Sequence, residues 1–428
     1  MRGLIGLGVL GLCAMAGGPA AAQGVPDVPS ALALAPPKNV PVRERSQPGY
    51  EPKGLRAGSF LALPRYAVRA SAIDNLFATE GDTEADQSLE QSLSVDVGST
   101  WSRHELAASA SLDHALYLDN DRENRLSASL RTRLRLDVTR DLALTATAAH
   151  AARSEARTTA ASRLASPREP IAFTESEIGL TVERRMPRFR VILAGSAQRL
   201  DYDDARALDG TALEQDDRDR DAYTVSVRTE AALSPDMFLL VQGGFNWRDY
   251  RLGAGAGRPD RDSAGYRVLA GTGFAISDLF RGELAAGLFH QSYDDPTLSD
   301  ESGLALRARL DWFLTQLMTL SFGADRQIAE ADLPGAAQRV QWALNARLDY
   351  EILRNLLFDA GYRYVEDSFG SIAREDTGHA VSAGLTWTLN RYLQLEGRYA
   401  FEQERSSGAD AGTDFDLSRA SATWRLRF

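Results

Sequence analysis

Arginine is the residue type in this chain whose spacing points most directly to a chemistry. Arg131, Arg133 and Arg135 occupy alternate positions of one segment, and Arg307 and Arg309 repeat that spacing later in the chain. A guanidinium group stays charged and presents a planar, bidentate donor to carboxylates and phosphates. Rows of arginine therefore suit either an acidic ligand or carboxylate partners on neighbouring segments, and the sequence leaves both possibilities open.

Groups that could catalyse a reaction or hold a metal are scattered along the sequence. The five histidines lack the spacing of metal ligands. They are His104, His114, His150, His290 and His379. His290 and Ser292 share one segment, but a hydrolase needs further groups at matched positions on a neighbouring element. We interpret them as an ordinary polar pair, and we predict no catalytic residue, no metal site, no cofactor and no enzymatic activity.

The charge balance limits the possible partners. The net charge of −11 argues against nucleic acid, because a nucleic-acid-binding surface is positively charged. The acidic segment 201–221 could bind calcium or bridge lipid headgroups, but it lacks the EF-hand spacing, which favours a solvated loop. Cys13 is the only cysteine in the sequence, so we expect neither a disulfide nor a cysteine nucleophile in the mature chain.

The elements that position the arginines are indicated by strict alternation. From Leu126 to Val138, large apolar residues alternate with arginine, serine and aspartate. Such a strand has water on one face and an oily environment on the other. Versions of the pattern recur to the end of the chain, and later segments fall short of the roughly 18 apolar residues of a membrane helix. Lipid is therefore the expected environment of the apolar face.

The N-terminal region differs from the rest. Residues 1–22 have the features of a secretory signal peptide, with Arg2, an apolar stretch and a small-residue cleavage site at the alanines 20–22. Residues 23–56 contain seven prolines, which are too frequent for strands. We interpret this segment as an extended periplasmic arm, either a disordered lead-in or a tether that partly plugs a pore. Residues 57–428 are assigned to one outer-membrane β-barrel.

The predicted strands are joined by alternating short and long connections. Short turns are expected near 139–140 and 234–236, whereas polar stretches such as 154–169 and 201–221 form long loops. Short periplasmic turns and long external loops are typical of outer-membrane barrels. The hairpins predict an all-β, transmembrane, antiparallel up-and-down β-barrel of about 18 strands, beginning at 60–73 and ending at 415–428. A soluble sandwich of two packed sheets is the alternative.

Aromatic residues beside the short turns predict a girdle at the periplasmic interface. They are Phe238, Phe280, Trp312, Phe313, Tyr350, Trp387 and Tyr392. The last predicted strand places Trp424, Leu426 and Phe428 on one face. A terminal phenylalanine after such alternation is similar to the signal read by the machinery that inserts outer-membrane barrels. These three residues are therefore the predicted insertion signal.

The opening of the predicted barrel resembles a known family. The stretch 54–60 (Gly-Leu-Arg-Ala-Gly-Ser-Phe), Pro64 and the stretch 74–79 (Asp-Asn-Leu-Phe-Ala-Thr) look like the first strand of the putative β-barrel porin 2 family. The continuation to Trp101 is also similar, and the rest of the chain resembles the family in topology. The resemblance implies an outer-membrane barrel of a Gram-negative bacterium, often linked to export of capsular or extracellular polysaccharide.

The polar faces of the strands are expected to line the pore. The candidate pore-lining residues are Arg65, Arg69, Arg131, Arg133, Arg135, Arg307, Arg309 and Arg347. These arginines could guide an anionic glycan, or they could pair with carboxylates on the same wall and brace the barrel. The two roles are compatible, because a braced wall can still favour anions.

The patterns and the resemblance together predict a passive, porin-like conduit for polysaccharide export. A general diffusion porin for small solutes is the runner-up, and a structural or adhesive surface barrel would be favoured if loops blocked the lumen. The expected partners are outer-membrane lipid and lipopolysaccharide, the barrel assembly machinery, periplasmic polysaccharide-export components and an anionic glycan. The driving force is expected to come from such components, because the sequence contains no nucleotide-binding motif.

Overall fold

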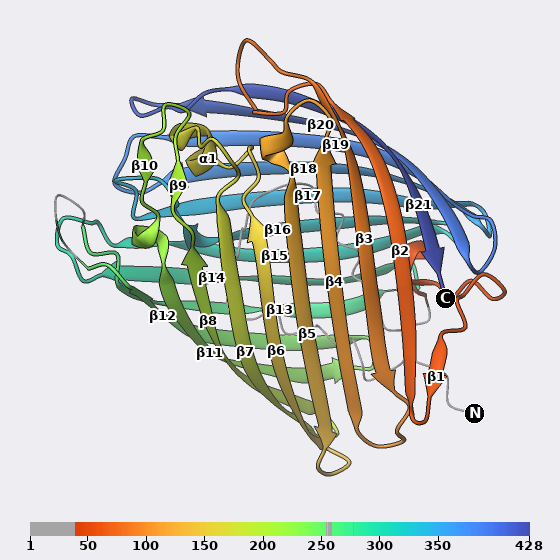
Figure 1. The fold of residues 1–428 in the computed structure, drawn as a ribbon. Coiled ribbons are helices and arrows are strands. Elements are labelled where there is room, and N and C mark those ends of the chain that lie inside the picture. The colour runs from red at the N-terminus through yellow and green to blue at the C-terminus, as the bar shows by residue number, and fades with distance from the viewer. Residues whose placement is uncertain (1–38, 254, 256–258, 277) are drawn as a thin grey trace.

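The computed structural model describes residues 39–428 apart from 254, 256–258 and 277. Within this part of the chain, eighteen long antiparallel strands pair with their neighbours in sequence order, and the first closes against the last (Figure 1). The predicted 18-strand barrel is confirmed. The strands are β2 (Phe60–Ile73), β3 (Asp86–Ser99), β4 (Glu105–Tyr117), β5 (Arg125–Asp137), β6 (Leu142–Ser154), β7 (Ala172–Arg185), β8 (Phe189–Tyr202), β11 (Arg220–Ser234), β12 (Met237–Tyr250), β13 (Ser263–Ile276), β14 (Phe280–Tyr293), β15 (Glu301–Thr315), β16 (Met318–Glu330), β17 (Gln338–Leu353), β18 (Leu356–Phe369), β19 (Glu375–Thr388), β20 (Leu393–Ser407) and β21 (Phe415–Arg427).

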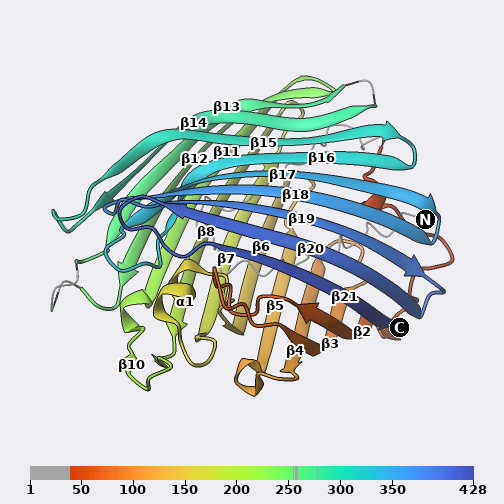
Figure 2. The same cartoon turned by 90° about the horizontal axis from the view of Figure 1, so that it is seen from above.

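The smaller elements lie at the two ends of the barrel. The strand β1 pairs with the start of β2, while β9 and β10 form a small hairpin within a long loop. The helix α1 lies in another long loop, at the end of the barrel opposite the C-terminus (Figure 2). These elements are η1 (Val42–Glu44), β1 (Leu55–Ala57), η2 (Asp121–Glu123), α1 (Ala160–Ala165), β9 (Ala205–Arg206), β10 (Ala212–Leu213) and η3 (Asp216–Arg218). Among the described residues, none of the helices is long and apolar enough to cross a membrane. The predicted signal peptide, 1–22, lies outside the described residues.

The connections alternate between short turns and long loops. Residues 316–317 join β15 to β16 and residues 354–355 join β17 to β18, whereas residues 155–171 join β6 to β7 and residues 203–219 join β8 to β11. The ends of the barrel are therefore chemically different. By the usual arrangement of such barrels, the short turns face the periplasm and the long loops face the exterior.

The outer faces of the strands are apolar, whereas the inner wall is polar on strands such as β5 and also carries a buried apolar cluster that includes Leu240, Leu269 and Phe289. Leu126, Leu130 and Leu136 of β5 are exposed on the outside, where they form part of a continuous apolar surface. Arg131 and Arg133 project from the opposite face of the same strand, because successive side chains of a strand point in opposite directions. Closure pairs every strand on both sides, which satisfies the backbone hydrogen bonds that an open edge would expose to lipid.

The predicted aromatic girdle is correct only in part. Trp387 and Tyr392 are exposed on the outer surface near the short turns, and Phe280 stacks on Trp312 with ring centroids 5.4 Å apart. Phe238 and Phe313, in contrast, are buried and belong to the inner face. They lie next to short turns like the others, but the alternation of their strands turns them inward.

Asn75, in the stretch that resembles the family, closes the barrel at its long-loop end. Its side-chain amide donates to the carbonyl oxygen of Asp416 at 2.8 Å, which links the loop after β2 to β21. The same amide donates to the carbonyl oxygen of Thr79, while its side-chain oxygen accepts the backbone N–H of Thr79. Asp74 accepts the backbone N–H of Ser418. This stretch therefore fixes the seam where the first and last strands meet.

Candidate functional site: the barrel interior

The most deeply buried charges of the inner wall centre on Arg228. This side chain on β11 is 1% exposed and donates to Glu230 and Glu283, each at 2.7 Å. Glu230 also accepts from Arg190 of β8 at 3.3 Å, and Arg190 donates to Glu183 of β7. The chain of contacts therefore runs from β7 through β8 and β11 to β14. Burial makes each of these charges depend on its partner, because an unpaired charge inside a protein is costly.

Other predicted pore-lining arginines are bound to the wall in the same way. Arg307 and Arg267 share Asp325, with distances of 3.4 and 3.3 Å. Arg347 forms ion pairs with Asp349 and Asp359, and Arg398 donates to Asp359 at 2.8 Å. Along β13 to β20, therefore, much of the arginine charge is neutralised by carboxylates on the same wall.

The arginines of β2 are bonded as well, but they are less deeply buried. Arg65 pairs with Asp96, and Arg69 donates to Glu90 at 3.2 Å. Arg309 of β15 also has a bonding or electrostatic partner. In the strand register it lies opposite Glu283 of β14 and Gly323 of β16. The inner wall near β2 and β15 thus carries both signs of charge.

The row on β5 includes two exposed arginines. Arg131 is exposed, and its charge interacts with Glu177 across β6. Arg133 pairs with Glu105 at 3.3 Å, and these two side chains are 46% and 42% exposed. Arg135 is more firmly held, because it contacts Asp137 at 3.0 Å and Glu183 at 3.7 Å. Of the predicted pore-lining residues, Arg131, Arg133 and Arg309 are exposed, and Arg131 and Arg133 lie together on one strand, where they can exchange a protein partner for a solute.

Several partners of the arginines were missed by the sequence analysis. Glu183 and Asp325 occupy inward positions of their own strands, so alternation alone could have placed them on the correct face. Their pairing could not be read in that way. It depends on which strands are neighbours and on how far each strand is shifted along the next.

The described part of the N-terminal arm enters the short-turn end of the barrel. Val42 is buried, and its backbone N–H donates to the hydroxyl of Thr319 on β16 at 3.2 Å. Arg43 donates to Asp349 of β17 at 3.1 Å, although the two residues are 306 positions apart. Arg45 donates to the carbonyl oxygen of Gln316 in the turn between β15 and β16. Residues 42–45 are thus bound to the inner wall of β16 and β17 and to the adjacent turn.

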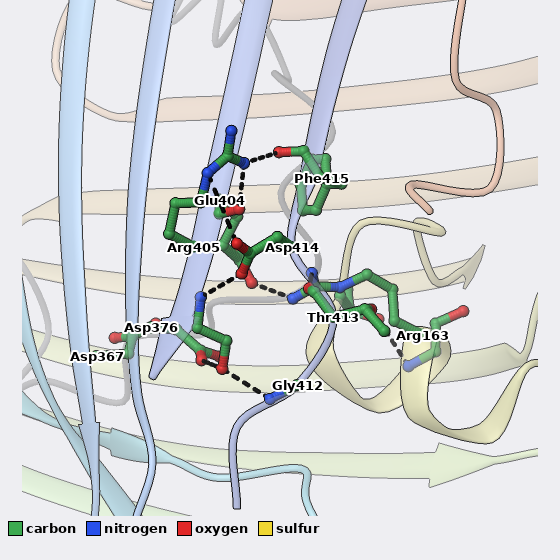
Figure 3. A network of polar contacts seen from close by, with 12 residues as sticks. Arg163, Asp367, Asp376, Glu404, Arg405, Gly412, Thr413, Asp414 and Phe415 are labelled. Atoms are coloured by element: carbon green, nitrogen blue, oxygen red, sulfur yellow. Dashed lines mark hydrogen bonds and ion pairs between the residues drawn. The ribbon is translucent and has the colours of Figure 1, made fainter. Parts of the chain in front are cut away.

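The long loops interlock at the opposite end. Arg163, at the last turn of α1, pairs with Glu404 of β20, donates to the carbonyl oxygen of Thr413 at 2.6 Å and lies over the ring of Phe415 (Figure 3). Since α1 belongs to the loop after β6, these contacts join that loop to β20, to β21 and to the connection between them. Ala160 of the same helix packs against the loop 331–337. The loop 155–171 therefore extends across the long-loop end of the barrel.

A second set of charges holds the loops together. Arg218 pairs with Glu155, and Asp332 lies 3.9 Å from Arg218 and 3.8 Å from Arg220. Burial raises the pKa of Glu155, and the attraction of Arg218 only partly opposes this effect. Burial also disfavours the charged form of Asp332, but Arg218 and Arg220 outweigh it and lower the pKa of that carboxyl. We refer to loops 155–171, 203–219 and 331–337 together as the loop cover.

The histidines do not form a catalytic arrangement in the described structure. His290 hydrogen-bonds to Ser302 at 2.7 Å, whereas Ser292 donates to the carbonyl oxygen of Ala264. His150 contacts Ser176, and His379 contacts Tyr362. The described residues also include no group of three or more His, Cys, Asp or Glu side chains placed to hold a metal. These histidines hydrogen-bond across neighbouring strands.

The predicted insertion signal lies on the outer surface of the closing strand. Trp424, Leu426 and Phe428 are all exposed there, with Phe428 at 47%. The backbone N–H of Phe428 donates to the carbonyl oxygen of Pro64 at 3.1 Å, and its ring lies 6.4 Å from that of Tyr392. The terminal residue thus reaches both neighbours of β21.

We expect Phe428→Ala to reduce the amount of barrel inserted in the outer membrane several-fold, because it removes the terminal apolar side chain of this outward row. Heat-modifiable mobility of the membrane fraction measures insertion. Leu417→Ala, at the other end of β21 and on its inner face, is the control. Normal insertion of Phe428→Ala would show that the terminal side chain is not required.

Comparison with solved structures finds distant similarities only. Solved structures that resemble this chain include OccAB4 of Acinetobacter baumannii, at 13% identity and a TM-score of 0.46, covering 86% of this chain and 98% of that one. OccK1 (OpdK) of Pseudomonas aeruginosa is 12% identical, with a TM-score of 0.45, and the match covers 86% of this chain and 99% of that one. A mutant of the ferric enterobactin receptor PfeA from the same species is 7% identical, with a TM-score of 0.47, and the match covers 86% of this chain and 80% of that one. Similarities this distant do not bear on the substrate.

The family comparison covers most of the sequence. No curated protein sequence matches the chain. The family model described as putative beta-barrel porin 2 matches residues 47–428, which include every strand of the closed barrel. This extent is much larger than the opening stretch 54–79 that carries the resemblance in the sequence. A porin-type channel, rather than an enzyme, is what the family and the architecture together indicate. The chain belongs to the putative beta-barrel porin 2 family.

Proposed function

We propose that this protein is a channel in the outer membrane of a Gram-negative bacterium through which a polysaccharide, acidic in part, is exported. The observation that carries the proposal is the pair Arg131 and Arg133, which face water inside a closed barrel. Two residues along a strand are separated by roughly 7 Å, so the two guanidinium groups can contact successive acidic groups of an extended chain. Membership of a porin family supports a conduit.

Two other functions remain as alternatives. A general diffusion porin is supported by the ion pairs that neutralise much of the inner wall, because they leave few charges to select a solute. A structural or adhesive barrel is supported by the loop cover, because loops that stay closed would prevent conduction. Conductance of the purified protein separates the closed barrel from both channels, and dependence of secretion on the protein separates export from diffusion.

The double variant Arg131→Gln/Arg133→Gln tests the export proposal. Glutamine keeps hydrogen-bonding capacity while removing charge, so we expect the reversal potential in a salt gradient to shift toward cation selectivity. In a deletion strain, secretion of acidic polysaccharide should be lost and should be restored several-fold less well by the variant than by the original chain.

A matched variant controls for the change in net charge. Arg168→Gln/Arg206→Gln removes two exposed charges from the long loops and should leave selectivity and secretion unchanged. If the deletion strain secretes polysaccharide normally, the export proposal is wrong. If secretion depends on the protein but the β5 double variant behaves like the original chain, then these arginines brace the wall and do not contact the polymer.

A further inference from the structure

The two sides of the barrel interior differ in their access to water. On β11, the inward side chains of Thr224, Ser226 and Arg228 are all buried, and Gln242 of β12 is 2% exposed. On β5 and β6, Arg131, Arg133 and Thr147 are exposed, although they project from the same inner face. The β3–β7 side and the β11–β14 side are therefore not equivalent.

A single line of paired residues makes the contrast direct. In the strand register, Arg133 pairs with Thr147, Thr147 with Gly179, Gly179 with Ser196, and Ser196 with Thr224. The first two side chains of this line are exposed and the last is buried. The change occurs between β6 and β11, within one continuous wall.

Small side chains keep the exposed side open. The hydroxyl of Thr147 lies close to Gly179. A Cβ added at Gly179 would be only 2.7 Å from that hydroxyl oxygen, so a larger residue would displace it. The hydroxyls of Ser111 and Ser129 contact each other at 2.9 Å across β4 and β5. Short hydroxyl-bearing side chains leave space in front of the wall and offer both donors and acceptors to a hydrated solute.

The positions of the arm and of the loop cover agree with this difference between the β3–β7 side and the β11–β14 side. The described end of the arm is bound to β16 and β17, well away from β3–β7. The loop 155–171, in contrast, begins directly at the end of β6 and returns into β7. A solute moving along β3–β7 would leave the barrel beneath this loop.

We propose that permeation follows the inner face of β3–β7, and that this face accommodates an extended polyhydroxylated chain. Hydroxyls at Ser129 and Thr147 exchange hydrogen bonds with sugar hydroxyls, while Arg131 and Arg133 contact carboxylates where the chain carries them. The β11–β14 side acts as a packed wall. The position of the path stands on the observed exposure alone, whereas the identity of its occupant rests on the proposed function.

Single cysteines test the position of the path. Thr147→Cys and Ser226→Cys, each with Cys13→Ser, place a thiol on the exposed side and on the buried side. The sulfonated methanethiosulfonate reagent MTSES is added to channels in planar bilayers, and labelling of the folded protein is followed in parallel by mass spectrometry. Arg163→Ala serves as the background if the loop cover prevents current in the original chain.

We expect MTSES to modify Thr147→Cys rapidly and to reduce its current several-fold, whereas Ser226→Cys should react much more slowly and keep its current. Labelling remains measurable even where conduction is low. Rapid modification and block at Ser226→Cys, with none at Thr147→Cys, would overturn the proposed path. Equal modification and block at both positions would overturn it too, because the interior would then be uniformly open.

The occupant is tested with oligogalacturonate, an acidic sugar chain, and with neutral maltohexaose as its matched partner. Both sugars should slow the modification of Thr147→Cys by MTSES, and oligogalacturonate should slow it more than maltohexaose does. In the Arg131→Gln/Arg133→Gln background, the two sugars should protect equally. Absence of protection by either sugar would contradict the polyhydroxylated occupant while leaving the position of the path intact. Normal secretion in the deletion strain, in turn, would refute export without altering the labelling result.

Discussion

Arg228→Ala is expected to lower the free energy of unfolding of the barrel by about 3–5 kcal/mol, the cost of breaking a buried ion pair by removing one partner. Arg228 is 1% exposed and bonded to both Glu230 and Glu283. Its loss leaves Glu283 without this partner in a setting where a carboxylate is poorly solvated. Urea unfolding in detergent or lipid, followed by tryptophan fluorescence and by heat-modifiable mobility, measures the change.

Two variants distinguish charge burial from loss of bulk. Arg133→Ala removes an arginine of equal size from an ion pair that is about half exposed, and should change stability by less than about 1 kcal/mol. Arg228→Met/Glu283→Leu removes both charges and keeps the volume, while Glu230 retains Arg190. This double variant should recover most of the lost stability. If Arg228→Ala is as stable as Arg133→Ala, the network on β11 does not brace the barrel.

Arg163→Ala should increase single-channel current several-fold and make the channel less prone to closure. Arg163 joins the loop 155–171 to Glu404, to the carbonyl oxygen of Thr413 and to the ring of Phe415, as seen in Figure 3. Removing the guanidinium group breaks these contacts together while leaving the strands of the barrel unchanged. The loop should then move away from the opening more often.

The control for this prediction is another arginine of the long loops. Arg206 is exposed, and its side chain donates to the carbonyl oxygen of Gly210 within its own hairpin. Arg206→Ala should therefore leave the current unchanged. An Arg163→Ala channel with the current and closure frequency of the original chain would show that the loop 155–171 does not limit passage.

Strand number and the alternation of two faces along the strands were determined by the sequence. The segment 60–73 was predicted as the first strand, and β2 has those bounds; the last strand was predicted at 415–428, and β21 spans Phe415–Arg427. The reason is local. Alternate side chains point to opposite faces, so a chain placed between lipid and water must repeat a period of two in every strand.

Pairing across the barrel was decided only by the tertiary structure. Alternation placed Arg131 and Arg307 on the inner face, yet it could not show that the first is exposed and the second is buried. That outcome depends on which side chains of neighbouring strands reach one another, and this is fixed by register. The contacts of Arg43 with Asp349 and of Arg163 with Glu404 join residues 306 and 241 positions apart. The folded barrel brings such residues together, and a local pattern of residues cannot predict contacts between positions so far apart in the sequence.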